Sequence, residues 1–152
     1  RGRKRSLYEG GVRVPGFVVW PAKIESGKHS DFPLVTSDYF PTILEILGEK
    51  NQFPVSPVDG ISMVPVWNET LKERPSPIGF QHGENKTLTG NRYKLVQMGN
   101  KLELYDLNTD PFETNDISSE MPEKVSEMKK ELTDFVASCD SSINGADYKY
   151  TD

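Results

Sequence analysis

The chain has 152 residues, a net charge of -5 and 35% hydrophobic residues, a polar composition that is still globular rather than disordered. No stretch approaches the roughly 18 apolar residues of a membrane-spanning helix, and the single cysteine, Cys139, excludes an internal disulfide and a cysteine metal cluster. The sequence begins with Arg1 instead of methionine, so we expect a portion of a longer protein or a processed chain.

Basic residues are concentrated at the start of the chain. Residues 1–13 carry one acidic side chain, Glu9, whereas the rest of the chain is acidic overall. The basic side chains of this segment are Arg1, Arg3, Lys4, Arg5 and Arg13. A localised basic patch favours a small anionic ligand and argues against nucleic acid, because nucleic-acid binding needs basic residues spread along a whole face.

A glycine pair and an apolar run follow the basic cluster. Gly10 and Gly11 predict a sharp reversal, because glycine adopts backbone angles that are closed to other residues. The run from Val12 to Trp20, punctuated by proline, predicts a strand. We therefore expect a cationic loop at the edge of a β-sheet, where α/β proteins commonly bind anions.

A helix is predicted across Asp38–Leu47. Asp38 is a good N-cap residue, Pro41 is tolerated in the first turn, and Gly48 suits the C-terminal stop. Apolar residues recur at helical spacing within this range, so one face should be buried. The predicted role of Asp38 is capping rather than catalysis.

The second half of the chain predicts a small antiparallel sheet and one helix. Short strands are expected over residues 78–81, 92–97 and 102–105, with a tight turn at Gly99-Asn100. The helix should begin at Pro122 and form one apolar stripe. This stripe comprises Val125, Met128, Leu132 and Phe135, and residues 140–152 should be a frayed polar tail. The expected domains are residues 1–72 and 73–152.

Two Asn-x-Thr sequons occur, at Asn68 and Asn85. This pattern is an acceptor for N-linked glycans and matters only in a secreted eukaryotic protein.

The opening segment has the form Lys-x-x-x-x-Glu-Gly-Gly-x-Arg-x-Pro, from Lys4 to Pro15. It resembles a late segment of the sulfatase family, within the alkaline-phosphatase-like superfamily. The predicted helix at 38–48, the Asp-Gly-Ile-Ser stretch at 59–62 and the segments 91–96 and 103–116 are also similar to sulfatases. The resemblance runs from Arg1 to about Phe135 and covers about the last third of a complete sulfatase.

The resemblance implies roles for several residues. In sulfatases the lysine at the Lys4 position holds a sulfate oxygen, so Lys4 is the candidate catalytic residue. Glu9 and Arg13 resemble the pair that fixes the loop, together with Gly10 and Gly11. His82 is a candidate substrate-binding residue, because the C-terminal unit of sulfatases lends such side chains to the rim of the pocket. The other interpretation of this histidine, a surface residue in a turn, stays open.

The fold class that the resemblance implies is α/β (α+β). Residues 1–72 would supply the last strand and helix of a large α/β domain, and residues 73–152 a small antiparallel sheet packed by one C-terminal helix. The resemblance also favours a periplasmic, secreted or lysosomal location.

The complete enzyme would use calcium and a formylglycine made from a Cys/Ser-x-Pro-x-Arg motif. This chain has no such motif, and none of the family's metal ligands can be carried over to it. We therefore expect the chain to be inactive alone. Its expected partners are the missing N-terminal catalytic region and a sulfated small molecule or glycan as the substrate.

Two alternatives remain. The first is a phosphodiesterase or phosphonate hydrolase of the same superfamily, which an unmodified Thr or Ser nucleophile upstream would indicate. The second is a non-catalytic module in which residues 73–152 bind an anionic glycan, which glycan binding by the chain alone would support.

Overall fold

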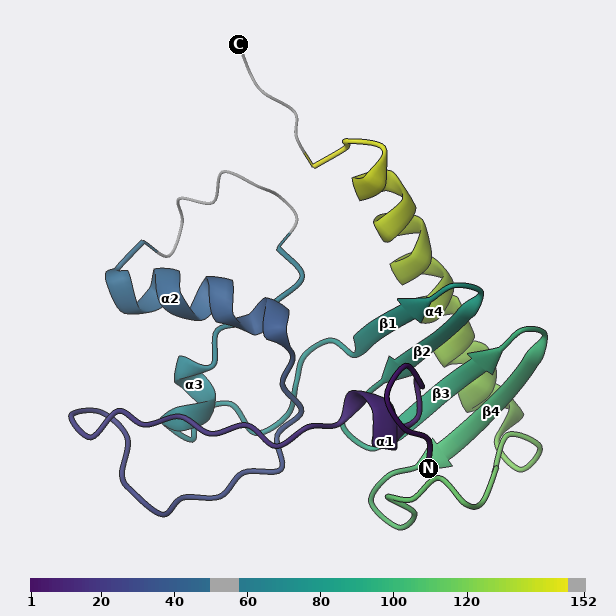
Figure 1. The fold of residues 1–152 in the computed structure, drawn as a ribbon, viewed down its shortest axis with the longest axis horizontal. Helices are drawn as coiled ribbons and strands as arrows, with labels where there is room; N and C mark the ends of the chain where they lie inside the picture. The colour runs from purple at the N-terminus through teal and green to yellow at the C-terminus, as the bar shows by residue number, and fades with distance from the viewer. Residues whose placement is uncertain (50–57, 148–152) are drawn as a thin grey trace. The chain divides into compact units, whose positions relative to one another are not determined.

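The computed structural model describes residues 1–49 and 58–147 (Figure 1). The chain divides into two compact units. We call residues Arg1–Gly16 with Ser76–Asp140 the sheet unit, and residues Phe17–Pro75 with Ser141–Asp152 the helical unit. The contacts thus group the basic opening segment with the sheet that follows residue 75, while the expected division at residues 72 and 73 stays a prediction for the complete protein.

The sheet unit is built on a four-stranded antiparallel sheet of order β1-β2-β3-β4. The strands are β1 (Ile78–His82), β2 (Asn85–Thr89), β3 (Tyr93–Met98) and β4 (Lys101–Asp106). The predictions of β1, β3 and β4 are confirmed. The tight turn between β3 and β4 is also confirmed, because Gly99 adopts the left-handed conformation there, with φ +57. Strand β2 was not predicted, because its Thr-rich, polar sequence lacks a strong apolar alternation.

One face of this sheet packs against the helix α4 (Pro122–Ile143), as Figure 1 shows. The core between them consists of Leu88, Leu95, Leu104, Met128 and Leu132, with Val125 and Phe135 packed around it. The predicted helix start and apolar stripe are confirmed. Helix α4 runs on to Ile143, so residues 140–143 are helical rather than frayed. Residues 148–152 of the predicted tail lie outside the described part of the chain.

The opposite face of the sheet is covered by the opening segment, which includes the short helix α1 (Glu9–Val12). Side chains alternate between the faces of a strand. Leu95 therefore points toward α4, while its neighbours Lys94 and Val96 point toward the opening segment. A second apolar cluster, made of Tyr8, Val96 and Tyr105, forms on this face.

The strand predicted from Val12 to Trp20 is wrong for this structure. Val12 ends α1, and residues 13–20 form neither helix nor strand. Phe17 is 91% exposed and Val19 is 78% exposed. A strand needs a neighbour for its backbone hydrogen bonds, and within the described residues no strand pairs with this run. A continuous apolar run is typical of a strand buried on both faces of a parallel sheet, and residues 1–49 and 58–147 contain no such sheet.

The helical unit contains η1 (Thr36–Asp38), α2 (Tyr39–Leu47) and α3 (Val64–Trp67). The prediction of α2 is confirmed, and Gly48 ends this helix in the left-handed conformation, with φ +83. The expected buried face is not formed, because Ile43 and Leu47 are exposed. In the described part of the chain, no helix combines the length and apolar character needed to cross a bilayer.

Asp38 occupies the predicted N-cap position of α2, but its side chain makes no capping hydrogen bond to that helix, which corrects the predicted role of the carboxylate. Its carboxylate is fully buried and accepts two hydrogen bonds from the Arg74 guanidinium, at 2.8 and 2.9 Å. It also accepts the backbone N–H groups of Val35 and Ile61, at 2.8 and 2.9 Å. Gly60 lies against the Ser37 carbonyl, where a Cβ would be 2.1 Å from that oxygen. Asp38 therefore joins three segments of the helical unit.

Burial by itself would raise the pKa of the Asp38 carboxyl. Hydrogen bonds from Arg74, Ile61 and Val35 outweigh this effect, and the pKa lies below its ordinary value. Because the folded pKa is depressed, the carboxylate stabilises the fold above its unfolded pKa of about 4, and this contribution is lost as the pH falls through the folded value.

We predict that Asp38→Asn destabilises the helical unit by about 3–5 kcal/mol, because it leaves the Arg74 charge buried without a counter-charge. Both tryptophans of the chain, Trp20 and Trp67, lie in this unit, so the fluorescence change on urea unfolding measures the effect. The matched control is Asp59→Asn in the same unit, an exposed site where a change within about 0.5 kcal/mol is expected. Equal stability of the two variants would contradict the role of Asp38.

Candidate functional site

The site is the opening segment of the sheet unit, residues 1–13, which carries Lys4. The chain turns back on itself here through backbone hydrogen bonds from Ser6 N–H to Arg3 and from Gly10 N–H to Arg1, at 2.8 and 2.7 Å. A Cβ on Gly10 would lie 2.4 Å from the Gly2 carbonyl oxygen, and one on Gly11 2.0 Å from the Ser6 carbonyl oxygen.

Close backbone approach, and not a left-handed conformation, is what this glycine pair provides. Neither Gly10 nor Gly11 has a positive φ, and α1 begins at Glu9. The predicted reversal at the glycine pair is therefore wrong in its cause. The chain turns before the pair, and the glycines allow the start of α1 to pack directly on the preceding residues.

A buried ion cluster attaches the base of the segment to the sheet. The Lys94 side chain is fully buried, and its ammonium group lies 2.7 Å from Glu9 Oε1 and 2.9 Å from Glu113 Oε1. The first contact is a hydrogen bond, and the second is an ion pair. The Glu9 N–H also donates to Glu113 Oε2, at 2.7 Å. Arg13 lies 3.9 Å from Glu9, on the exposed side of the pair.

A second polar cluster centres on Glu103 of β4. The hydroxyl groups of Tyr8 and Tyr105 both donate to Glu103 Oε2, the latter at 2.9 Å. Lys101 donates to Glu103 Oε1 at 2.6 Å, and Arg1 donates to the Tyr105 hydroxyl at 2.8 Å. The segment therefore forms hydrogen bonds with this cluster at two places, through Arg1 and through Tyr8.

The cluster shifts the pKa values of its members. Burial would raise the pKa of the Glu103 carboxyl, but hydrogen bonds from Lys101, Tyr8 and Tyr105 outweigh burial and lower it. Burial and the hydrogen bond to Glu103 raise the pKa of Tyr8 to about 12. The same two causes raise the pKa of Tyr105. Both tyrosines therefore stay protonated as hydrogen-bond donors at neutral pH.

Lys4 lies on the free turn of the segment, between Arg3 and Arg5. All three side chains are exposed, and Lys4 forms no hydrogen bond or ion pair with any residue that the structure describes. The arrangement places an available ammonium group on a turn whose base is fixed. Such a group can bind one oxygen of an anion and stabilise charge that develops on it.

His82 is the last residue of β1 and pairs with Asn85 across a two-residue turn. It is exposed, and the described structure contains no hydrogen bond or ion pair between His82 and Lys4. Its roles as a rim residue and as a surface turn residue therefore both remain predictions.

The residues present do not fit calcium or a formylglycine. Within residues 1–49 and 58–147, no three His, Cys, Asp or Glu side chains come together as metal ligands. Cys139 is half-buried on α4 and is not followed by the Pro-x-Arg spacing that the modification needs. The described residues therefore supply neither a cluster of metal ligands nor the motif from which a formylglycine is made.

Sequence reasoning missed Lys94 and Glu113. Lys94 lies within the predicted strand 92–97, where a lysine side chain is expected to face solvent. Glu113 lies in a loop, where a carboxylate is also expected to be solvated. The one available signal was that both belong to the segments similar to sulfatases, at 91–96 and 103–116.

The family model described as N-sulphoglucosamine sulphohydrolase, C-terminal, matches residues 3–138. Arylsulfatase K of Xenopus laevis is 30% identical over 151 residues, which cover 88% of this chain and 27% of that protein. A sulfatase of Formosa agariphila is 32% identical over 146 residues, covering 80% of this chain and 26% of that protein. The chain thus spans about a quarter of the length of these relatives.

Solved structures show the same fold. The crystal structure of Ps i-CgsB superposes with a TM-score of 0.68 at 21% identity, over 76% of this chain and 27% of that chain. A second structure, which contains its substrate D-glucosamine-2-N,6-O-disulfate, has a TM-score of 0.57 at 23% identity, over 86% of this chain and 29% of that chain. The α+β class is thereby confirmed. From the match of this C-terminal family model over residues 3–138, the chain belongs to the sulfatase family, as a C-terminal portion.

Proposed function

We propose that this chain is the C-terminal part of a sulfuric ester hydrolase and supplies the Lys4 ammonium group to its sulfate pocket. The observation that carries the proposal is the position of Lys4, an available cation on a turn whose base is fixed by buried ion pairs. The family match supports sulfate as the anion.

The role of Lys4 follows from the charge changes in sulfate ester hydrolysis. Attack at sulfur and departure of the alcohol place negative charge on the bridging and sulfuryl oxygens. An ammonium group held in place before reaction stabilises this charge without reorganising in the transition state. In sulfatases the nucleophile is a formylglycine and the metal is calcium, and we assign both to polypeptide outside this chain.

We also propose a sulfated glycan as the substrate. Ps i-CgsB has been crystallised with k-i-k-neocarrahexaose, and a further structural neighbour with D-glucosamine-2-N,6-O-disulfate. These are ligands of those proteins, and their shared carbohydrate chemistry supports the substrate class here. His82 would contact the sugar from the rim of the pocket.

Exposed apolar side chains in each unit support a longer polypeptide as the partner of this chain. Val14 of the sheet unit is 77% exposed, and in the helical unit Phe17 and Val19 are exposed still further. Ile43 and Leu47 on α2 are also exposed. Large exposed apolar groups of this kind are typical of surfaces that another part of the protein covers.

We predict that the purified chain does not hydrolyse an aryl sulfate, because the nucleophile and the calcium are assigned to polypeptide outside it. Turnover by the chain alone would overturn this assignment.

We predict that Lys4→Ala in the complete protein lowers kcat/KM by roughly 10²–10³, the usual cost of removing one transition-state donor. The expected thermal stability is unchanged, because the side chain is exposed and forms no hydrogen bond or ion pair with any described residue. Arg3→Ala, on the same turn, is the matched control and should change turnover much less. Unchanged turnover in Lys4→Ala would remove Lys4 from the pocket.

We predict that Lys94→Met frees the opening segment from the sheet, because Glu9 and Glu113 lose their buried counter-charge. Breaking such a pair costs about 3–5 kcal/mol. Amide hydrogen exchange should accelerate first in residues 6–13, before the strands open. Lys86→Met on β2 is the matched control, because this lysine of the same sheet forms no ion pair with any residue that the structure describes. Equal protection of residues 6–13 in both variants would show that Lys94 does not hold the segment.

A further inference from the structure

The two Asn-x-Thr sequons have very different surroundings. One begins at Asn68 in the helical unit, directly after α3, and the other at Asn85, the first residue of β2. Sequence alone treats them as equal, because both satisfy the same three-residue pattern.

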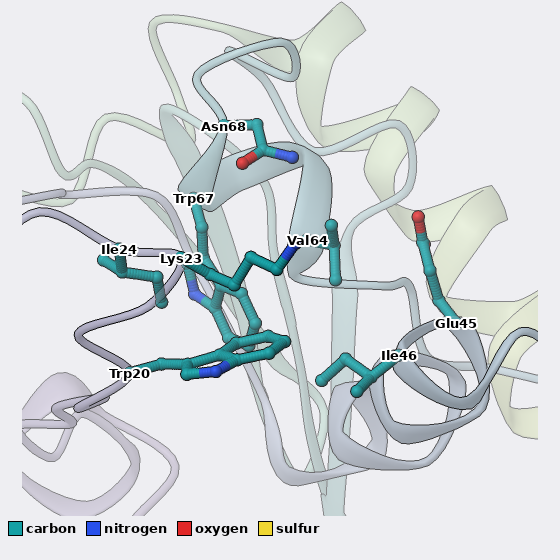
Figure 2. A pocket seen from close by; sticks show the side chains of 8 residues that line it. All are labelled: Trp20, Lys23, Ile24, Glu45, Ile46, Val64, Trp67 and Asn68. Atoms are coloured by element: carbon teal, nitrogen blue, oxygen red, sulfur yellow. The ribbon is translucent and has the colours of Figure 1, made fainter.

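The first sequon is open. Asn68, Glu69 and Thr70 are all exposed, and the Asn68 side-chain amide forms no hydrogen bond with any described residue. The Thr70 hydroxyl lies at the surface and donates to the Pro65 carbonyl, at 3.1 Å. Glu69 adopts a positive φ of 58, directly after the residue that follows the helix. Figure 2 shows Asn68 at the edge of a hollow of about 310 Å³ that Trp20 and Trp67 also line.

The second sequon is closed. Thr87 is fully buried, and its hydroxyl donates to the Leu95 carbonyl at 2.7 Å. Asn85 Oδ1 accepts the Gly99 N–H at 3.2 Å. Strand β2 pairs with β1 on one side and β3 on the other, so an enzyme could reach Thr87 only before β2 joins the sheet or after it has left it.

We propose that Asn68 is an N-glycosylation site of this chain in a eukaryotic secretory pathway and that Asn85 is not. Transfer requires access to both the asparagine amide and the threonine hydroxyl. Before the chain folds both sequons are accessible, but once β2 has paired only Asn68 and Thr70 remain so. This inference is independent of the proposed sulfatase function.

The reaction balances with one co-substrate, a lipid-diphosphate-linked oligosaccharide. The Asn68 Nδ2 forms a bond to the anomeric carbon of the first sugar, and the bond from that carbon to the diphosphate oxygen breaks. The lipid diphosphate leaves with the electron pair, and the amide nitrogen loses one proton. No atom is oxidised or reduced.

The test is secretion of the whole chain from cultured mammalian cells, with both cells and medium analysed. Peptide-N-glycosidase removes the glycan and converts its asparagine to aspartate, which peptide mass spectrometry detects in heavy-oxygen water. We expect one glycan per chain, at Asn68, and little or no conversion at Asn85. Asn68→Gln and Thr70→Ala should abolish the glycan, whereas Asn85→Gln should retain it.

Thr70→Ser distinguishes loss of the acceptor sequence from damage to the fold as the reason why Thr70→Ala carries no glycan. It keeps the hydroxyl and its hydrogen bond to Pro65, so the glycan should remain. A chain without any glycan, a glycan mainly at Asn85, or a glycan that survives Asn68→Gln would each overturn the proposal.

Discussion

The position of the opening segment on the sheet depends on the ion pairs of the buried Lys94 ammonium group. A buried charge is tolerated only when it is paired and hydrogen-bonded, and Lys94 is paired with Glu9 and Glu113. Its partner Glu9 is 85 residues away in the sequence. Three segments that resemble sulfatases separately, around residues 9, 94 and 113, therefore meet at one cation. Because the penalty for an unpaired charge is large, this contact determines where the opening segment lies on the sheet.

The opening segment combines a fixed base with an available tip. Tyr8 and Glu9 form hydrogen bonds with Glu103, Lys94 and Glu113, which fix the base of the segment. Beyond them the chain turns, and the side chain of Lys4 stays exposed. A catalytic cation needs its position determined before the reaction, and a buried supporting shell is the general way to achieve this. The proposed sulfate contact by Lys4 thus rests on side chains that never touch the substrate.

The helical unit uses the same physical device at Asp38 and Arg74, where a fully buried carboxylate joins segments from Val35 to Arg74. Around this fixed centre, several apolar side chains stay exposed, as expected of a surface that further polypeptide covers. The sequon at Asn68 lies at an open chain turn of the same unit. The sequon at Asn85, by contrast, is part of a paired strand, so one three-residue pattern occurs in two different structural surroundings.

The sequence by itself determined the elements whose signals are local. The spacing of apolar residues after Pro122 predicts α4, the Gly99 turn predicts the β3–β4 hairpin, and Gly48 predicts the end of α2. The motif from Lys4 to Pro15 also indicates the family and the candidate lysine. Only the tertiary structure decided the rest. The run from Val12 to Trp20 forms no strand here, because a strand depends on a neighbour that its own residues cannot supply. Lys94, Glu113 and Arg74 were missed as buried ion-pair partners for the same reason. Burial of a charge depends on residues that are distant in the sequence, and a local sequence pattern does not show which distant residues will lie next to it.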